Sequence, residues 1–209
     1  MGHGDHAEQA APEPRAPEAP APLPPAQRPA RGWPVVHYGP VPRHRPDTWD
    51  LRVFGATASG DELRLDAGQL GALPRATVRS DMHCVTKWTV RDLEWSGVLT
   101  STLLDLEPPA DDVRHVMVWA EYGYSANLPL AAFAEPGTML ATHVGAQPLT
   151  PEHGWPLRLV CPSLYAWKSA KWVRAIEYLV EDRRGFWEER GYHLHGDPWL
   201  EERYSYQER

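Results

Sequence analysis

Hydrophobic residues recur along the chain in short runs that are separated by Gly, Pro and Asp. Runs of this length between turn-forming residues are typical of β-strands. Helical spacing is rarer and predicts short helices over residues 66–73, 101–106 and 186–190, of which the first begins at the capping residue Asp66 and ends at Pro74. The predicted strands are residues 49–54, 76–79, 113–119, 139–144, 157–161 and 172–180.

The balance of these elements indicates the fold class. Many strands with few short helices predict an α+β domain with mixed β-sheets. No regular helix separates successive strands, so parallel βαβ units are not expected. The chain has 209 residues, enough for one domain of ordinary size, and it shows no internal repeat.

The first 31 residues differ in composition from the rest. Alanine and proline alternate from Ala10 to Ala30, and residues 1–31 contain one leucine and no aromatic residue. Such a segment buries too little apolar surface to offset the entropy lost on ordering. We therefore expect a disordered arm over residues 1–31, partly in polyproline II conformation, and a folded domain over residues 32–209.

Charge and cysteine content exclude several functional classes. The net charge is −7, from 21 basic and 28 acidic side chains, so phosphate backbones are repelled and no nucleic-acid partner is expected. The two cysteines, Cys84 and Cys161, lie far apart, which fits free thiols in a reducing compartment and neither a disulfide framework nor a zinc site. With no run of about 18 apolar residues and no N-terminal signal pattern, the sequence predicts a cytoplasmic protein without a membrane span.

Four segments carry polar groups that a globular core does not need. Residues 33–42 contain three prolines and one glycine, which fix an extended loop from which His37 and Tyr38 project. Residues 120–130 place Tyr124 in a loop after a strand. That position suits an active-site group, and it equally suits a tyrosine packed at a turn.

Cys84 lies at the end of a predicted strand or in the loop beyond it. Its thiolate could be a nucleophile, a metal ligand or an inert core group, since free cysteine is often buried. The neighbours Lys87 and His83 could lower the pKa of the thiol. A soft thiolate also suits a soft or high-valent metal.

Arg158 interrupts an apolar strand, and burying a guanidinium is costly unless it meets an anion. Lys168, Ser169 and Lys171 follow in a loop. Together with turn N–H groups they could hold a phosphate. The alternative is an internal pair between Arg158 and a carboxylate.

Taken together and in this order, the four segments resemble the molybdenum-binding domain of the sulfite oxidase family, which includes sulfite oxidase, plant nitrate reductase and a bacterial methionine-sulfoxide reductase. The resemblance runs from Trp33 to the C-terminus and is nearest to short bacterial sulfite oxidase-like proteins that consist of this domain alone. It implies a sulfite-oxidase-type molybdopterin-binding fold, a molybdenum–molybdopterin cofactor (Mo-MPT) and oxidoreductase activity.

The resemblance also implies roles for individual residues. Cys84, in His-Cys-Val-Thr-Lys-Trp, falls on the thiolate that ligates the metal, and Tyr124, before Ser-Ala-Asn-Leu-Pro-Leu, falls on a tyrosine near the metal. Both are expected to be catalytic. Cys161 matches no ligand and is expected to be a core thiol. The implied cofactor-binding residues are His37, Tyr38, His83, Cys84, His153, Arg158, Ser169, Ala170 and Lys171.

Departures from the family pattern bear on the substrate. Where sulfite oxidase has an arginine before the loop histidine and two arginines after the cysteine, this chain has Val36 and the residues Val85-Thr86-Lys87-Trp88. Fewer arginines hold sulfite or nitrate less well. The pattern Cys-Val-x-x-Trp is nearer to the methionine-sulfoxide reductase and favours the reductive direction. No haem domain is present, so electrons would pass through a separate electron-transfer partner.

The leading hypothesis is a two-electron oxidoreductase that transfers an oxygen atom at molybdenum ligated by Cys84, with a small oxyanion, S-oxide or N-oxide as the small-molecule substrate. One alternative is a carrier module that binds molybdopterin without turnover. Another is a metal-free domain with Cys84 as a reactive thiol and His83 or His153 as its base. The last is an interaction domain without chemistry, tethered by the N-terminal arm.

Overall fold

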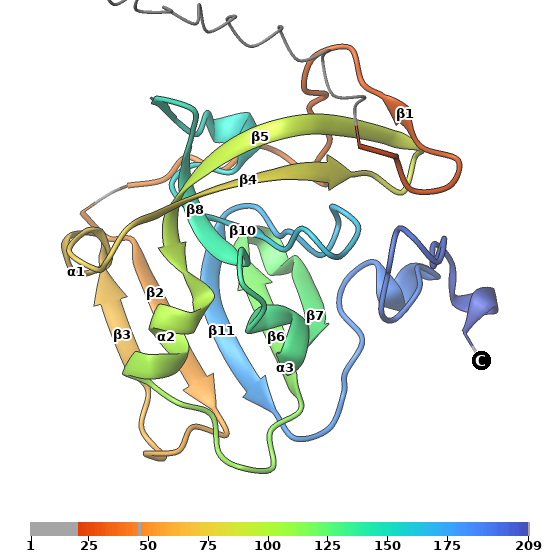
Figure 1. The fold of residues 1–209 in the computed structure, drawn as a ribbon. Helices are drawn as coiled ribbons and strands as arrows, with labels where there is room; N and C mark the ends of the chain where they lie inside the picture. The colour runs from red at the N-terminus through yellow and green to blue at the C-terminus, as the bar shows by residue number, and fades with distance from the viewer. Residues whose placement is uncertain (1–20, 46, 209) are drawn as a thin grey trace, which may run out of the picture.

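The computed structural model describes residues 21–45 and 47–208, which form two β-sheets with short helices at their edges (Figure 1). The larger sheet contains β1 (Arg28–Pro29), β4 (Ala76–His83), β5 (Trp88–Leu99), β8 (Met139–Val144), β9 (Gln147–Pro148) and β10 (Arg158–Val160). The smaller sheet contains β2 (Asp50–Gly55), β3 (Leu63–Asp66), β6 (His115–Ala120), β7 (Ser125–Pro129) and β11 (Val173–Leu179).

Helices are few and short. The α-helices are α1 (Ala67–Gly71), α2 (Thr100–Leu106) and α3 (Leu130–Phe133). Single 3-10 turns are η1 (Glu121–Gly123), η2 (Pro151–His153), η3 (Glu188–Arg190) and η4 (Ser205–Gln207). The start of α1 follows from its sequence, because the side chain of Asp66 accepts a hydrogen bond from the N–H of Gln69 and the side chain of Gln69 accepts one from the N–H of Asp66.

Both sheets are mixed. In the smaller sheet the order is β3-β2-β11-β6-β7, with β11 parallel to β2 and antiparallel to β6. In the larger sheet β5 pairs in antiparallel fashion with β4 and β8 and in parallel with β1. These sheets confirm the predicted α+β class with mixed sheets and few helices.

The long strand β5 passes close to β8, and glycine permits this approach. An added Cβ at Gly97 would lie 2.0 Å from the carbonyl oxygen of Leu140, so no other residue fits without a backbone shift. Beside this crossing, Trp95 is fully buried against Met82 and Met139. This close contact between β5 and β8 therefore fixes the end of the β4–β5 hairpin that lies opposite its turn.

Most predicted elements are present. The six predicted strands correspond to β2, β4, β6, β8, β10 and β11, and the predicted helices to α1, α2 and the 3-10 turn η3. The sequence analysis did not find β5, the longest strand, because charged residues interrupt its apolar pattern. Two of them, Asp92 and Glu94, lie at the surface and pair with Arg79 of β4.

The predicted boundary at residue 32 is too late. Residues 1–20 lie outside the described residues, but residues 21–31 lie against the domain, and β1 pairs with β5. Main-chain hydrogen bonds hold this segment, from Arg28 N–H to Lys87 O at 3.2 Å and from Ala30 N–H to Thr89 O at 2.8 Å. Hydrogen bonding to the edge of β5 thus orders residues 21–31, whose own apolar content is too low to order them.

Two further expectations concern Cys161 and the membrane. Cys161 is a free thiol with 1% exposure in the main hydrophobic core, and its burial raises the pKa to about 11, which confirms the predicted core thiol. Within residues 21–45 and 47–208, no helix has both the length and the apolar character needed to cross a lipid bilayer.

Candidate active site

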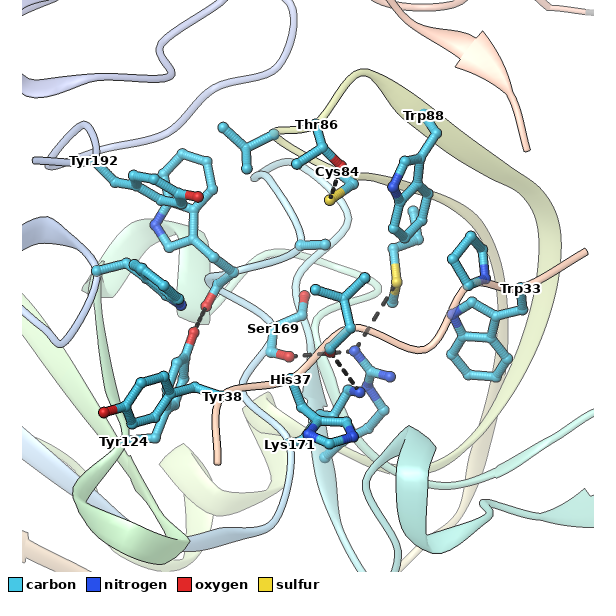
Figure 2. A pocket seen from close by; sticks show the side chains of 18 of the residues that line it. Trp33, His37, Tyr38, Cys84, Thr86, Trp88, Tyr124, Ser169, Lys171 and Tyr192 are labelled. Carbon is cyan, nitrogen blue, oxygen red and sulfur yellow. Dashed lines mark hydrogen bonds between the residues drawn. The ribbon is translucent and has the colours of Figure 1, made fainter. Parts of the chain in front are cut away.

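The four segments singled out in the sequence converge on one pocket between the hairpin tip and the loop after β10 (Figure 2). Seven of the predicted site residues line it, and three do not. Lining the pocket are His37, Tyr38, Cys84, Tyr124, Arg158, Ser169 and Lys171. His83, His153 and Ala170 are absent from its wall within the described residues.

Cys84 lies at the tip of the hairpin that joins β4 to β5. The turn is closed by a hydrogen bond from Cys84 N–H to Trp88 O at 2.8 Å and one from Lys87 N–H to Cys84 O at 3.0 Å. The Sγ atom lies 3.2 Å from the hydroxyl of Thr86, and the residue is 8% exposed. The thiol is therefore held on a rigid tip at the pocket wall.

Two residues from distant parts of the chain fix this tip, and neither was singled out in the sequence. The Gln27 side chain donates a hydrogen bond to Cys84 O at 3.0 Å. Arg203 is buried and donates to Val85 O at 2.5 Å and to Pro25 O at 3.4 Å. The backbone on both sides of the thiol is thus clamped by segments that come before and after the four motifs.

Lys87 and His83 do not have the roles that the sequence suggested. Lys87 is exposed at the outside of the turn and does not line the pocket. His83 is buried with its Nδ1 atom 2.9 Å from the Thr89 hydroxyl, and burial lowers its pKa. Side chains along a strand alternate between faces, so Met82 and Cys84 face the pocket while His83 points away.

Arg158 is the buried cation of the pocket. Its guanidinium is 2% exposed and donates to His153 O at 2.9 Å and to Ser169 O at 3.3 Å. No carboxylate within the described residues pairs with it, and its Nε atom has no hydrogen-bond partner there. Burial lowers its pKa to about 10, so the group remains charged at neutral pH. A buried guanidinium of this kind is the donor that an anion would satisfy.

Lys171 lies beside Arg158 on the same side of the pocket. Its Nζ atom donates to Val36 O at 2.8 Å and to Glu152 O at 2.6 Å. Burial, and then the nearby charge of Arg158, lower the pKa of Lys171 to about 7. An anion bound between the two side chains would favour the charged form of Lys171.

Lys168 points elsewhere, which corrects its predicted place in the phosphate cradle. Its Nζ atom lies 2.6 Å from Glu188 Oε1, and both side chains are 0% exposed. It also donates to Asn127 O, Asn127 Oδ1 and Leu194 O. Ala170 is likewise buried in the main core, where its carbonyl accepts from Leu159 N–H at 2.8 Å.

His153 lies outside the pocket wall and packs against Trp33, which is part of the wall. Its ring stacks on Trp33 at 3.8 Å between centroids, and its Nδ1 atom lies 3.0 Å from the Thr150 hydroxyl. Burial is the largest cause that lowers the pKa of His153, and the charges of Lys171 and Arg158 lower it further. The buried Nε2 atom has no partner among the described residues.

Tyr124 lines the pocket, but its hydroxyl is already engaged. The hydroxyl donates to Trp167 O at 2.5 Å. Burial and the charge of Glu188 raise the pKa of Tyr124 well above its usual value. The phenol therefore keeps its proton.

Aromatic rings form much of the remaining wall. Trp33, Trp88 and Trp172 belong to the four segments, whereas Trp167, Trp187 and Tyr192 do not. Trp187 lies in the predicted helix over residues 186–190, directly before η3, and Tyr192 lies in the turns that follow. The aromatic residues of the wall outside the predicted set are Trp33, Trp88, Trp167, Trp172, Trp187 and Tyr192.

Comparisons with known proteins place this pocket in a family. The sequence profile described as "Oxidoreductase molybdopterin binding domain" matches residues 38–187. The "Uncharacterized oxidoreductase YuiH" of Bacillus subtilis is 40% identical over 181 residues, which cover 86% of this chain and 90% of that protein. The mitochondrial sulfite oxidase of Macaca fascicularis is 28% identical over 73% of this chain, and the match spans only 33% of its own length.

The fold has a counterpart among solved structures. The sulfane dehydrogenase SoxCD from Paracoccus pantotrophus superposes with a TM-score of 0.61 and 20% identity, over 68% of this chain and 40% of the other. Together with the profile match over most of the described domain, this confirms the resemblance and the predicted fold. The chain belongs to the molybdopterin-binding oxidoreductases of the sulfite oxidase type, whose cofactor is molybdenum–molybdopterin.

Proposed function

We propose that the chain is a two-electron molybdenum oxidoreductase in which Cys84 is the protein ligand of the metal. The observation that carries this proposal is the charge arrangement of the pocket. The thiol of Cys84 lies on one side of the pocket and Lys171 on the other, with Arg158 next to Lys171. Within the described residues, neither cation pairs with a carboxylate. A cofactor with an anionic tail and a soft-metal head has the complementary arrangement.

The residues on the cationic side fit a phosphate group. Arg158 supplies a buried guanidinium with an unpaired Nε, and Lys171 supplies an ammonium beside it. Gly154 has a φ of +114°, and a Cβ there would lie 3.0 Å from Arg158 Cβ and 3.2 Å from Lys171 Cβ. Glycine is therefore needed for the two cationic residues to pack this closely.

The remaining predicted residues would hold and enclose the pterin. His37 and Tyr38 lie on the loop at the mouth, and Ser169 lies on the wall beside Arg158. Molybdenum bound through a pterin dithiolene supplies two-electron redox and oxygen-atom exchange. The Thr86 hydroxyl, 3.2 Å from Cys84 Sγ, would donate a hydrogen bond to the thiolate and stabilise its charge.

Substrate and partner belong to the same proposal. The substrate would be a small oxyanion, S-oxide or N-oxide, and electrons would be exchanged with a separate protein in the cytoplasm. The absence of Lys87 from the pocket wall supports the S-oxide and N-oxide classes, because it removes a cation that an oxyanion would need.

The metal-free thiol enzyme has less support. In such an enzyme a histidine activates the cysteine within hydrogen-bond reach. Among the described residues, His83 bonds to Thr89 and His153 to Thr150, and neither contacts Cys84. The group at hydrogen-bond distance from Cys84 Sγ is the hydroxyl of Thr86, which is not a base at neutral pH.

The proposal is tested by elemental and pterin analysis of the full chain, purified without oxygen from a host that makes molybdopterin. We expect about one molybdenum and one pterin per chain, with the metal lost or its spectrum changed in Cys84→Ser. Cys161→Ala is the matched control, because it removes the other thiol, which lies in the core. Wild-type protein without metal and pterin would contradict the proposal, and bound cofactor without turnover of any oxide would favour the carrier module.

A further inference from the structure

The turn that carries Cys84 is strained, and strand β1 lies beside it at the start of β5 (Figure 1). Lys87, the last residue of the turn, has a left-handed φ of +70°, a conformation that favours glycine. Its carbonyl accepts a hydrogen bond from Arg28 N–H at 3.2 Å. A residue other than glycine keeps such a backbone only where the surrounding structure holds it. Strand β1 is therefore part of what holds the turn in this conformation.

The side chain of Gln27 links the turn to the body of the β4–β5 hairpin. Its Nε2 atom donates to Cys84 O at 3.0 Å, and its Oε1 atom accepts from the Thr89 hydroxyl at 3.2 Å. Cys84 O also accepts from Lys87 N–H at 3.0 Å, so both of its lone pairs are engaged. The peptide group that follows the thiol-bearing residue is thus fixed by a side chain from outside the hairpin.

Two buried side chains give this contact a direction. Thr89 is 0% exposed, and its hydroxyl lies 2.9 Å from Nδ1 of the buried His83. A hydroxyl has one proton, which Thr89 donates to Gln27, so its oxygen accepts from His83 Nδ1–H. Every hydrogen bond in the series from His83 through Thr89 and Gln27 donates toward Cys84. A buried network with every member satisfied in this way has one arrangement and is rigid.

We propose that Gln27, Thr89 and His83 are positioning residues of the metal site, and that their series of hydrogen bonds fixes the orientation of the Cys84 thiolate toward the metal. This inference rests on the proposed role of Cys84 as the ligand. In the part of the chain that the structure describes, none of the three residues lines the pocket, so each acts through Cys84. Gln27 also lies before residues 38–187, the range that the family profile matches.

The first test measures alkylation of the thiols by iodoacetamide in the metal-free full chain, with mass spectrometry of each cysteine. Cys161 in the core is the internal reference, because its alkylation reports opening of the whole domain. We expect Gln27→Met to raise the rate at Cys84 relative to Cys161 about fivefold, which corresponds to the loss of one hydrogen bond. Arg28→Met is the matched control, because Arg28 lies in the same strand with an exposed side chain.

The second test records the electron paramagnetic resonance of Mo(V) in the cofactor-loaded full chain. We expect the g values to shift in Gln27→Met and Thr89→Val, and to stay at the wild-type values in Thr89→Ser and Arg28→Met. Valine removes the hydroxyl and keeps the branched shape of threonine, whereas serine keeps the hydroxyl. A loss of stability alone would lower the yield of loaded protein without changing its g values.

Three results would overturn the inference. They are an unchanged alkylation ratio in Gln27→Met, equal effects in Arg28→Met, and wild-type g values in both Gln27→Met and Thr89→Val. If these failures occur in protein that contains molybdenum, the proposed function stands. Wild type without the metal would contradict the proposed function, and the alkylation ratio alone would then decide whether Gln27 holds the thiol.

Discussion

Strand β10 and the loop after it carry two buried cations, Arg158 and Lys168, with opposite surroundings. Lys168 meets Glu188 at 2.6 Å and three further acceptors, so its charge is neutralised within the protein. Arg158 is also buried, but within the described residues it meets two carbonyls, the Met82 sulfur and two tryptophan rings, and no carboxylate. The comparison shows that burial alone does not mark a ligand site. The cation that lacks an anion marks it.

The largest expected effect is on folding. Lys168→Met would leave Glu188 buried without its cation, and we expect the free energy of unfolding to fall by about 3–5 kcal/mol. Urea denaturation of the full chain measures the loss. The double variant Lys168→Met, Glu188→Gln should recover most of it, because the glutamine is uncharged and can still accept from Trp167 Nε1. Lys87→Met, at an exposed site, is the control, and an equal loss there would break the comparison.

A smaller effect on folding, with a large effect on the cofactor, is expected from Arg158→Met. Loss of two hydrogen bonds to carbonyls should cost about 1–2 kcal/mol in the metal-free chain. Retention of molybdenum and pterin should fall at least about tenfold, because the charge-assisted contact to an anion is lost. Arg114→Met is the matched control, since Arg114 also donates to two carbonyls but lies at the surface. Unchanged cofactor content in Arg158→Met would show that Arg158 is a structural cation like Lys168.

The smallest effect concerns pH. Because the pKa of Lys171 is lowered to about 7, the side chain is protonated at pH 6 and largely neutral at pH 8.5. We expect sulfate, which keeps its charge over this range, to bind the metal-free chain about threefold to tenfold more weakly at pH 8.5 than at pH 6. Calorimetry measures the affinity. Lys171→Met should bind weakly at both values, and pH-independent binding by wild type would contradict the role of Lys171.

The sequence predicted the fold class and most of the strands, because their apolar runs and turn residues are local signals. It also brought Cys84, Arg158 and Lys171 to one pocket through the family pattern. It could not separate Lys168 from Lys171. The two have the same chemistry three positions apart, and only the packing of Glu188 decides which one is neutralised.

Other parts of the site lacked any local signal. Tyr192 lies among turns, where neither strand nor helix periodicity applies, and the predicted helix over residues 186–190 did not indicate that Trp187 faces the pocket. Their place on the pocket wall depends on how the C-terminal segment returns to the hairpin tip. The role of Gln27 was hidden in the same way, because residues 21–31 are ordered by hydrogen bonds to β5 and not by burial of their own side chains.

The clamp on the Cys84 turn bears on the order of events in biosynthesis. Gln27 reaches the turn from an early part of the chain, whereas Arg203 holds Val85 from a position 118 residues later. The ribosome must release residue 203 before the turn can acquire both contacts. The turn that carries Cys84 is therefore completed only after residue 203 has been synthesised, and we expect the cofactor to enter the finished site after that point.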